Sequence, residues 1–131
     1  MARQVSKKLK FMIEITSGTP ENLIVAIAHG KVTGEDYETI FVPVIEEKLK
    51  THKKVRLLYL LGGDFSGYTF EAMWDDAKLG FGHWTAFEKI AIVTNVHWII
   101  DGVKFFRLFF PCPVKVFYDN ELAEAKVWVT A

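Results

Sequence analysis

The sequence has few of the features that mark secreted, membrane-spanning or nucleic-acid-binding proteins. Cys112 is the only cysteine in 131 residues, so no intrachain disulfide can form and a reducing compartment is expected. No stretch approaches the ~20 apolar residues of a spanning helix, and the start, MARQVSKKLKFMIEI, lacks the apolar run of a signal peptide. The 16 basic and 16 acidic residues cancel, which removes the electrostatic argument for nucleic acid as a partner. We therefore expect a cytoplasmic protein.

Aromatic side chains are what the chain has in abundance. Apolar residues make up 50% of the sequence and aromatic residues 15%, with 11 Phe and 4 Trp, which is the upper end for a soluble protein. A chain of 131 residues fits one domain with a sizeable core. The sequence shows no linker or internal repeat, so a single domain over residues 1–131 is predicted.

Hydrophobic periodicity and turn residues predict five strands and about four helices. The expected strands are 9–16, 23–28, 55–61, 89–94 and 114–118. The expected helices are 34–49, 69–81, 97–110 and 121–129. The first two strands are joined by a short turn, which indicates an antiparallel start, and the helix–strand units that follow indicate parallel strands. The order β-β-α-β-α-β-α-β-α predicts an α/β fold with a mixed, mostly parallel five-stranded sheet.

Local signals set the expected boundaries of these elements. Thr33 and Asp36 resemble a capping box at the start of the first helix, and Pro43 inside that helix predicts a kink near Thr39. Gly30 is expected to end the second strand, and residues 62–67, GGDFSG, are expected to form a loop. Asp119 and Asn120 are expected to cap the last helix.

The stretch from His97 to Phe110, HWIIDGVKFFRLFF, carries more apolar surface than a helix lying on a sheet requires. Two neighbouring stripes follow helical spacing. One contains Ile99, Val103, Phe106 and Phe110, and the other contains Trp98, Gly102, Phe105 and Phe109. We assign the first stripe to the sheet. The second is then expected to face the helix at 69–81 and a ligand or a membrane surface.

Several segments together resemble a known family. The segments GEDYETIFVPVIEEKL, VRLLYLL, EAMWDDAKLG, EKIAIVTNVHW and PVKVFYDNELAEAKVWV cover nearly the whole chain. This pattern resembles the SpoIIAA-like family of small bacterial proteins, which is related by fold to STAS domains and to CRAL-TRIO lipid carriers. None of the segments is a catalytic signature. The resemblance therefore implies a SpoIIAA-like, STAS-like fold more firmly than it implies an activity.

No catalytic, metal or cofactor site is expected. The four histidines lack the clustered spacing of a zinc site. Asp75 and Asp76 are adjacent on a predicted helix, so their carboxylates point about 100° apart and do not converge on one ion. Cys112 stands between two prolines without a basic neighbour in the sequence, which indicates a structural thiol.

The first functional hypothesis is a non-enzymatic binder or carrier of nonpolar small molecules or lipid. In this hypothesis the aromatic helices at 69–82 and 97–110 flank an apolar pocket, or open and lie at the periphery of the inner membrane. Glycines around them would act as hinges between closed and open forms. The sequence is also compatible with a protein partner and with assembly into a homo-oligomer. The residues expected to face the ligand or membrane are Phe65, Tyr68, Phe70, Met73, Trp74, Phe81, Trp84, Trp98, Phe105 and Phe109.

Two alternatives belong to other functional classes. Asp64-Phe65-Ser66-Gly67 loosely resembles the phosphoacceptor loop of STAS anti-sigma antagonists, although an aromatic residue separates Asp64 from Ser66. This resemblance implies a regulatory protein-interaction module controlled by phosphorylation of Ser66. An interfacially activated enzyme ranks third, because the sequence supplies no nucleophile for it.

Overall fold

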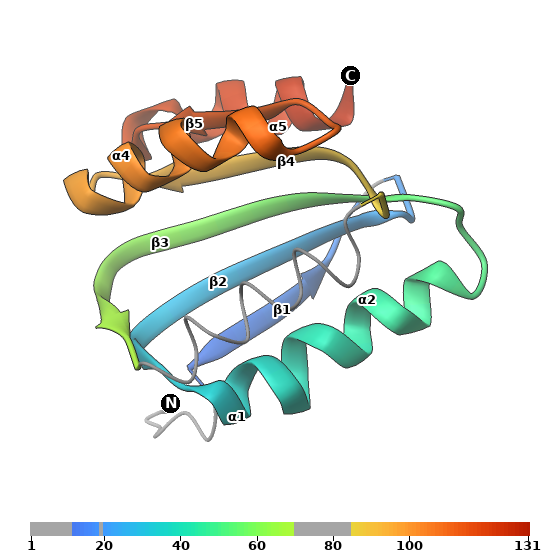
Figure 1. Ribbon diagram of the computed structural model, residues 1–131, viewed down its shortest axis with the longest axis horizontal. Helices are drawn as coiled ribbons and strands as arrows, with labels where there is room; N and C mark the ends of the chain where they lie inside the picture. Colours follow the sequence, from blue (N-terminus) through green and yellow to red (C-terminus); the bar gives the residue numbers. More distant parts are fainter. Residues whose placement is uncertain (1–11, 19, 70–84) are drawn as a thin grey trace.

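The computed structural model of the chain describes residues 12–18, 20–69 and 85–131 and shows an α/β fold built on one sheet (Figure 1). The strands are β1 (Ile13–Ser17), β2 (Leu23–Val32), β3 (Val55–Tyr68), β4 (Phe87–Thr94) and β5 (Val114–Phe117), and they lie in that order across the sheet. β1 pairs antiparallel with β2, whereas β2, β3, β4 and β5 pair in parallel. The predicted mixed, mostly parallel five-stranded sheet is confirmed.

Three helical segments are described. The first is continuous and comprises α1 (Gly34–Asp36), the π-helical turn η1 (Tyr37–Phe41) and α2 (Val42–Leu49). The second is α4 (His97–Phe106), which ends in the 3-10 turn η2 (Arg107–Phe109), and the third is α5 (Leu122–Thr130), preceded by the 3-10 turn η3 (Asp119–Glu121). The predicted helix at 69–81 lies outside the described residues except for Thr69, which is not helical.

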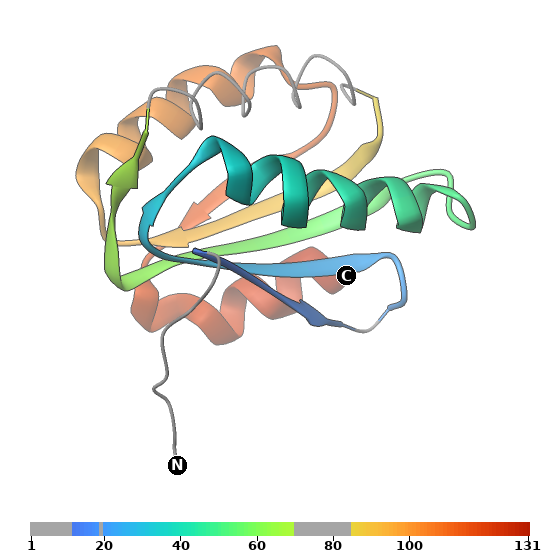
Figure 2. The ribbon, with the colours of Figure 1, turned by 90° about the horizontal axis from the view of Figure 1, so that it is seen from below.

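The helices cover both faces of the sheet (Figure 2). On one face α1, α2 and α4 lie over a core that includes Ile24, Leu57 and Tyr59. On the other face α5 lies over a smaller core that includes Leu58 and Ala125. Alternate residues of β3 therefore serve opposite cores, as expected for a central strand in a sheet covered on both sides.

The first helix begins as the sequence predicts. The backbone N–H and the hydroxyl of Thr33 donate to Oδ2 of Asp36 at 2.7 and 2.8 Å, and the Asp36 N–H donates to Thr33 Oγ1 at 3.2 Å. Pro43 does not produce a simple kink near Thr39. Instead, the Val42 N–H bonds to the carbonyl of Tyr37, five residues earlier. This wider turn accommodates the proline ring, which would crowd the carbonyl four residues before it in an α-helix.

Two predicted boundaries in the sheet are wrong. Gly30 does not end β2, because its φ of 51° lets the strand bend and continue to Val32. Residues 62–67 are not a loop but the second half of β3. The strands pair Ala28 with Leu61 and Gly30 with Phe65, so three residues of β3 stand opposite His29 alone. Gly62 and Gly63, which were predicted to lie in a loop, thus belong to a bulge inside a long strand.

A local side chain holds the start of α5, and a side chain from the sheet holds its end. The Tyr118 N–H donates to Oε1 of Glu121 at 2.7 Å. The predicted cap formed by Asp119 and Asn120 is wrong, since both residues form the 3-10 turn. At the other end, the Arg56 guanidinium donates to the carbonyls of Val129 and Ala131 at 2.9 and 2.8 Å. A cation from β3 therefore satisfies carbonyls that a helix leaves free at its C-terminus.

Candidate functional site

One side of α4 packs on the sheet, and it is wider than the sequence predicts. Ile99 is buried, and Val103 and Phe110 pack against the core shared with α1 and α2. Ile100 is also buried, at 4% exposure, although neither predicted stripe contains it. Two adjacent isoleucines thus share the anchoring of the first turn of α4.

The other side of α4 presents large apolar side chains to solvent. Trp98 is 54% exposed, Phe105 is 59% exposed and Leu108, in η2, is 76% exposed. Gly102 lies between Trp98 and Phe105 on the helix, and a Cβ built there would meet no atom within 4 Å. Lys104 and Arg107, also exposed, flank this stripe. We call Trp98, Phe105 and Leu108 the outer face of α4.

An aromatic row connects this outer face to the end of β3. The rings of Phe65 and Tyr68 meet edge to face with centroids 5.1 Å apart, and those of Tyr68 and Trp98 meet the same way at 6.3 Å. The structure therefore brings together three residues that the sequence predicts for the ligand-facing surface. Phe65 and Tyr68 lie in β3 and Trp98 lies in α4, so the row joins two elements that are 30 residues apart in the sequence between Tyr68 and Trp98.

The remaining predicted residues of this surface are not described. Thr69 is the last described residue before Thr85. The side chain of Phe109 is likewise outside the described part of the chain, as is that of Phe106. The predicted residues that fall between 70 and 84 are Phe70, Met73, Trp74, Phe81 and Trp84.

Tyrosine hydroxyls meet beneath the aromatic row. The Tyr68 hydroxyl donates to that of Tyr59 at 3.2 Å, and the hydroxyls of Tyr59 and Tyr37 are 3.5 Å apart. Tyr37 and Tyr59 are buried, so these polar atoms lie inside an otherwise apolar core. Neither Tyr37 nor Tyr59 is among the residues predicted for the ligand-facing surface. A tyrosine at a predicted core position is itself the signal, because a buried hydroxyl requires a partner.

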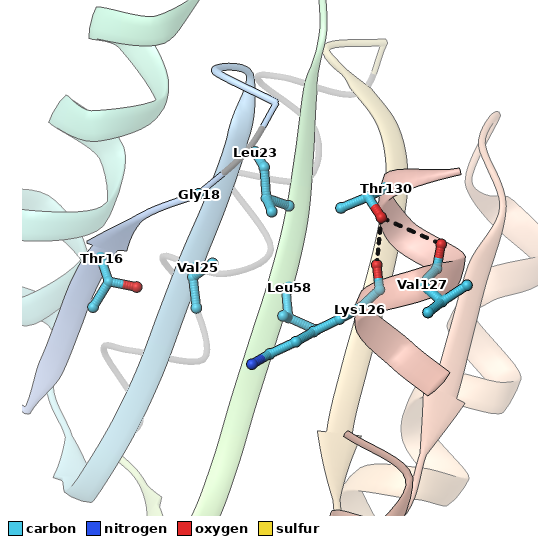
Figure 3. Close-up of a pocket in the computed structure, with 8 residues that line it drawn as sticks. All are labelled: Thr16, Gly18, Leu23, Val25, Leu58, Lys126, Val127 and Thr130. Carbon is cyan, nitrogen blue, oxygen red and sulfur yellow. Dashed lines mark hydrogen bonds between the residues drawn. The ribbon is translucent and has the colours of Figure 1, made fainter. Parts of the chain in front are cut away.

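A second apolar surface lies on the opposite face of the sheet, beside α5 (Figure 3). It is an open groove of about 410 Å³, with Leu23, Val25 and Leu58 on its sheet side. The exposed Lys126 extends from α5 across the sheet, and Val127 and Thr130 complete the helical wall. The groove is separate from the outer face of α4, since the sheet lies between them.

The bulge in β3 brings one histidine between two carboxylates. His29 Nδ1 lies 2.6 Å from Asp64 Oδ2, and His29 Nε2 lies 3.0 Å from Glu14 Oε1. Burial alone would lower the pKa of His29, but the hydrogen bonds that the ring donates to Asp64 and Glu14, together with the negative charges of these carboxylates, outweigh burial, so the pKa lies above the usual 6.5. The two carboxylates bind opposite nitrogens of the ring, so the three side chains do not point at one common position. Among the described residues, no group of three or more His, Cys, Asp or Glu side chains could hold a metal ion.

Ser66 and Cys112 lie outside these clusters. Ser66 is exposed, and it lies in β3 rather than in a loop. Cys112 is partly buried and packs against the core beneath α4. Burial raises the pKa of the Cys112 thiol, which favours the unreactive protonated form expected of a structural cysteine.

Two further findings concern membrane spanning and the similarity of the chain to known proteins. None of the described helices is long and apolar enough to cross a bilayer. A family model described as SpoIIAA-like matches residues 23–130. The chain is similar to an uncharacterized protein of the DUF3478 family with a SpoIIAA-like fold from Shewanella loihica PV-4, at 26% identity and a TM-score of 0.74, over 96% of this chain and 99% of that chain. No functionally curated protein matches the sequence.

Proposed function

The chain belongs to the SpoIIAA-like family, and we propose that it is a non-enzymatic binder of nonpolar molecules or lipid that works at a membrane surface. The single observation that supports this most directly is the outer face of α4, where Trp98, Phe105 and Leu108 are each more than half exposed. Large apolar side chains that gather at the surface of one element usually mark a binding site.

The chemistry of the outer face suits the boundary between water and lipid. Tryptophan and phenylalanine favour the interfacial region of a bilayer, where a large apolar ring can leave water without entering the acyl core. Burying the three half-exposed side chains would contribute roughly 2–4 kcal/mol in total. Lys104 and Arg107 lie beside the face and are exposed, so anionic head groups would add to the attraction.

The aromatic row extends the proposed surface toward the interior. Because Tyr68 contacts Trp98 on one side and Phe65 on the other, a ligand that displaces Trp98 would also disturb the end of β3. Tyr68 reaches the buried hydroxyl of Tyr59 as well. A bound amphiphile would therefore find apolar rings at the surface and hydrogen-bonding hydroxyls behind them.

Replacing both Trp98 and Phe105 with alanine is expected to weaken binding to vesicles of phosphatidylcholine and phosphatidylglycerol by about tenfold or more. Both side chains are largely exposed, so the loss of apolar contact with lipid should exceed the loss of packing in the protein. Co-sedimentation with vesicles measures the effect, and thermal unfolding checks that the fold persists. Addition of a long-chain fatty acid in place of vesicles distinguishes a soluble ligand from a membrane.

Val127→Ala is the matched control for this experiment. Val127 is 69% exposed but lies on α5, on the opposite face of the sheet. The variant should bind vesicles like the unaltered protein. Equal loss in both variants, or no co-sedimentation of the unaltered protein with either lipid, would remove the proposal.

Ser66 supports a second candidate, a protein-interaction module controlled by phosphorylation. Its hydroxyl is exposed, so a kinase has access to it, although its extended backbone differs from the loop that the family resemblance implied. Ser66→Asp is expected to change partner binding in a pull-down while shifting the free energy of unfolding by less than about 0.5 kcal/mol, as for other exposed positions. Failure of every tested kinase to modify Ser66 counts against this candidate.

A further inference from the structure

Three neighbouring strands are joined by one side-chain cluster at the edge of the sheet. Glu14 comes from β1, His29 from β2 and Asp64 from β3. His29 occupies the middle position, with one ring nitrogen toward each carboxylate. We call these three residues the histidine link.

The backbone around the link is shaped so that the three side chains can meet. Gly62, Gly63 and Asp64 all stand opposite His29, since the pairing passes from Ala28 with Leu61 directly to Gly30 with Phe65. The added residues of this bulge carry the Asp64 carboxylate to His29 Nδ1. Bulges re-aim side chains in this way and are common beside functional sites.

The link also continues toward the first helix through the backbone. The His29 N–H donates to the carbonyl of Met12 at 2.7 Å, and the Met12 N–H donates to Oδ1 of Asp36 at 2.9 Å. Asp36 is the N3 residue of the capping box that Thr33 begins at the start of α1. The N-terminal end of β1 is therefore held at two points, by the backbone of His29 and by Asp36, and the Glu14 side chain adds a third.

Ring protonation decides how many of the side-chain contacts can exist. An imidazolium donates through both nitrogens, whereas a neutral imidazole donates through one and accepts through the other. Carboxylates only accept, so a neutral His29 cannot bond to both Glu14 and Asp64. We propose that His29 is a proton-operated latch for the edge strand: its charged ring ties β1 to β3, and its neutral ring gives up the side-chain tie to β1, so that β1 opens more often.

The shorter contact identifies the carboxylate that is released. His29 Nδ1 and Asp64 are 2.6 Å apart, against 3.0 Å for Nε2 and Glu14, so the neutral ring keeps its proton on Nδ1. The lone pair of Nε2 then faces the Glu14 carboxylate, so the hydrogen bond between His29 and Glu14 of β1 is lost. The hydrogen bond between His29 and Asp64 in the bulge of β3 remains. Glu14 and Asp64 are the charged groups of the described chain that act on the ring.

The sign of the pH dependence follows from the raised pKa of His29. Stabilisation of β1 by the link is fully present below the pKa of an unfolded histidine and is lost as pH rises through the higher pKa of the folded ring. Glu14 and Asp64 are half or more exposed, so solvent screening limits the effect. Between pH 6 and pH 9 we expect the opening equilibrium of β1 amides to rise by about threefold to tenfold.

Amide hydrogen exchange read out by NMR tests the latch in the full chain. Exchange rates are corrected for intrinsic base catalysis and compared for the amides of β1 and for Phe65 to Tyr68 in β3. Nitrogen-15 shifts of the His29 ring report its pKa and its neutral tautomer in the same sample. The expected result is loss of protection in β1 and in the β2 amides that bond to it, such as the His29 N–H, without loss from Phe65 to Tyr68, and with the ring proton retained on Nδ1.

Three variants complete the experiment. His29→Gln cannot change charge, so protection of β1 in this variant should not depend on the ring titration, and His52→Gln serves as the matched control because His52 lies beyond α2 and away from the link. Glu14→Gln should move the pKa of His29 back toward its ordinary value. The proposal is overturned if β1 protection in the unaltered protein does not change across the titration of His29. It is equally overturned if β3 opens instead, or if the neutral proton resides on Nε2.

Discussion

Phe41→Ala is expected to lower the free energy of unfolding by about 3–5 kcal/mol, the usual cost of removing a fully buried phenylalanine. Phe41 is 1% exposed and lies in the π-helical turn. Its ring stacks on Tyr37 at 5.6 Å and meets the edge of Tyr59 at 5.7 Å. The alanine variant would leave a cavity where the first helix, the sheet and the tyrosine hydroxyls meet. Urea unfolding followed by far-ultraviolet circular dichroism measures the change.

Phe105→Ala is the matched comparison, since it removes the same ring from a position that is 59% exposed. Its cost should stay near 1 kcal/mol or below, because less apolar area leaves contact with the protein. A similar large loss in both variants would mean that the outer face of α4 belongs to the core. The proposed binding surface would then lose its support.

Asp36→Ala is expected to destabilise the fold by about 2–4 kcal/mol, because one buried carboxylate satisfies donors from two separate elements. Oδ2 accepts the N–H and the hydroxyl of Thr33, and Oδ1 accepts the N–H of Met12. Asp36 is only 3% exposed, so water cannot replace these bonds without opening the structure. The loss is measured by urea unfolding.

Asp36→Asn tests whether the charge or the shape of the side chain matters. Both carboxylate oxygens accept from N–H groups, so an amide must turn its own NH₂ toward a donor. Asparagine should therefore recover little of the stability. Asp101→Ala, at an exposed position of α4, is the control and should change stability by less than about 0.5 kcal/mol. Full rescue by asparagine would contradict the argument.

Features whose partners lie close together in sequence were predictable. The capping box of Thr33 and Asp36 spans three residues and is present. The strand count and the sheet type follow from apolar runs and short connections, and both are confirmed. Gly62 and Gly63 were misread because glycine marks loops and bulges alike, and only the pairing with β2 distinguishes them.

The candidate sites also divide into those formed by residues close in sequence, which were predictable, and those formed by distant residues, which were not. The exposure of Trp98 and Phe105 follows from helical spacing within one segment, which the sequence displays directly. The histidine link was missed because Glu14 and Asp64 stand 15 and 35 residues from His29. Those separations carry no periodic signal, and the bulge that brings Asp64 into place is a property of strand pairing. Ile100 was missed because it lies beside the first stripe on the side away from the second, which the sequence pattern assigned to the polar face.

The π-helical turn has a geometric consequence for the phase of the first helix. In a regular α-helix each step of four residues rotates about 40° past a full turn, so residues spaced by four drift around the axis. Tyr37, Phe41 and Ile45 are spaced by four, yet all three are fully buried. A π-helical turn rotates less per residue, so it cancels this drift between Tyr37 and Phe41. The π-helical turn before Pro43 thereby keeps Tyr37, Phe41 and Ile45 on the side of the helix that faces the sheet.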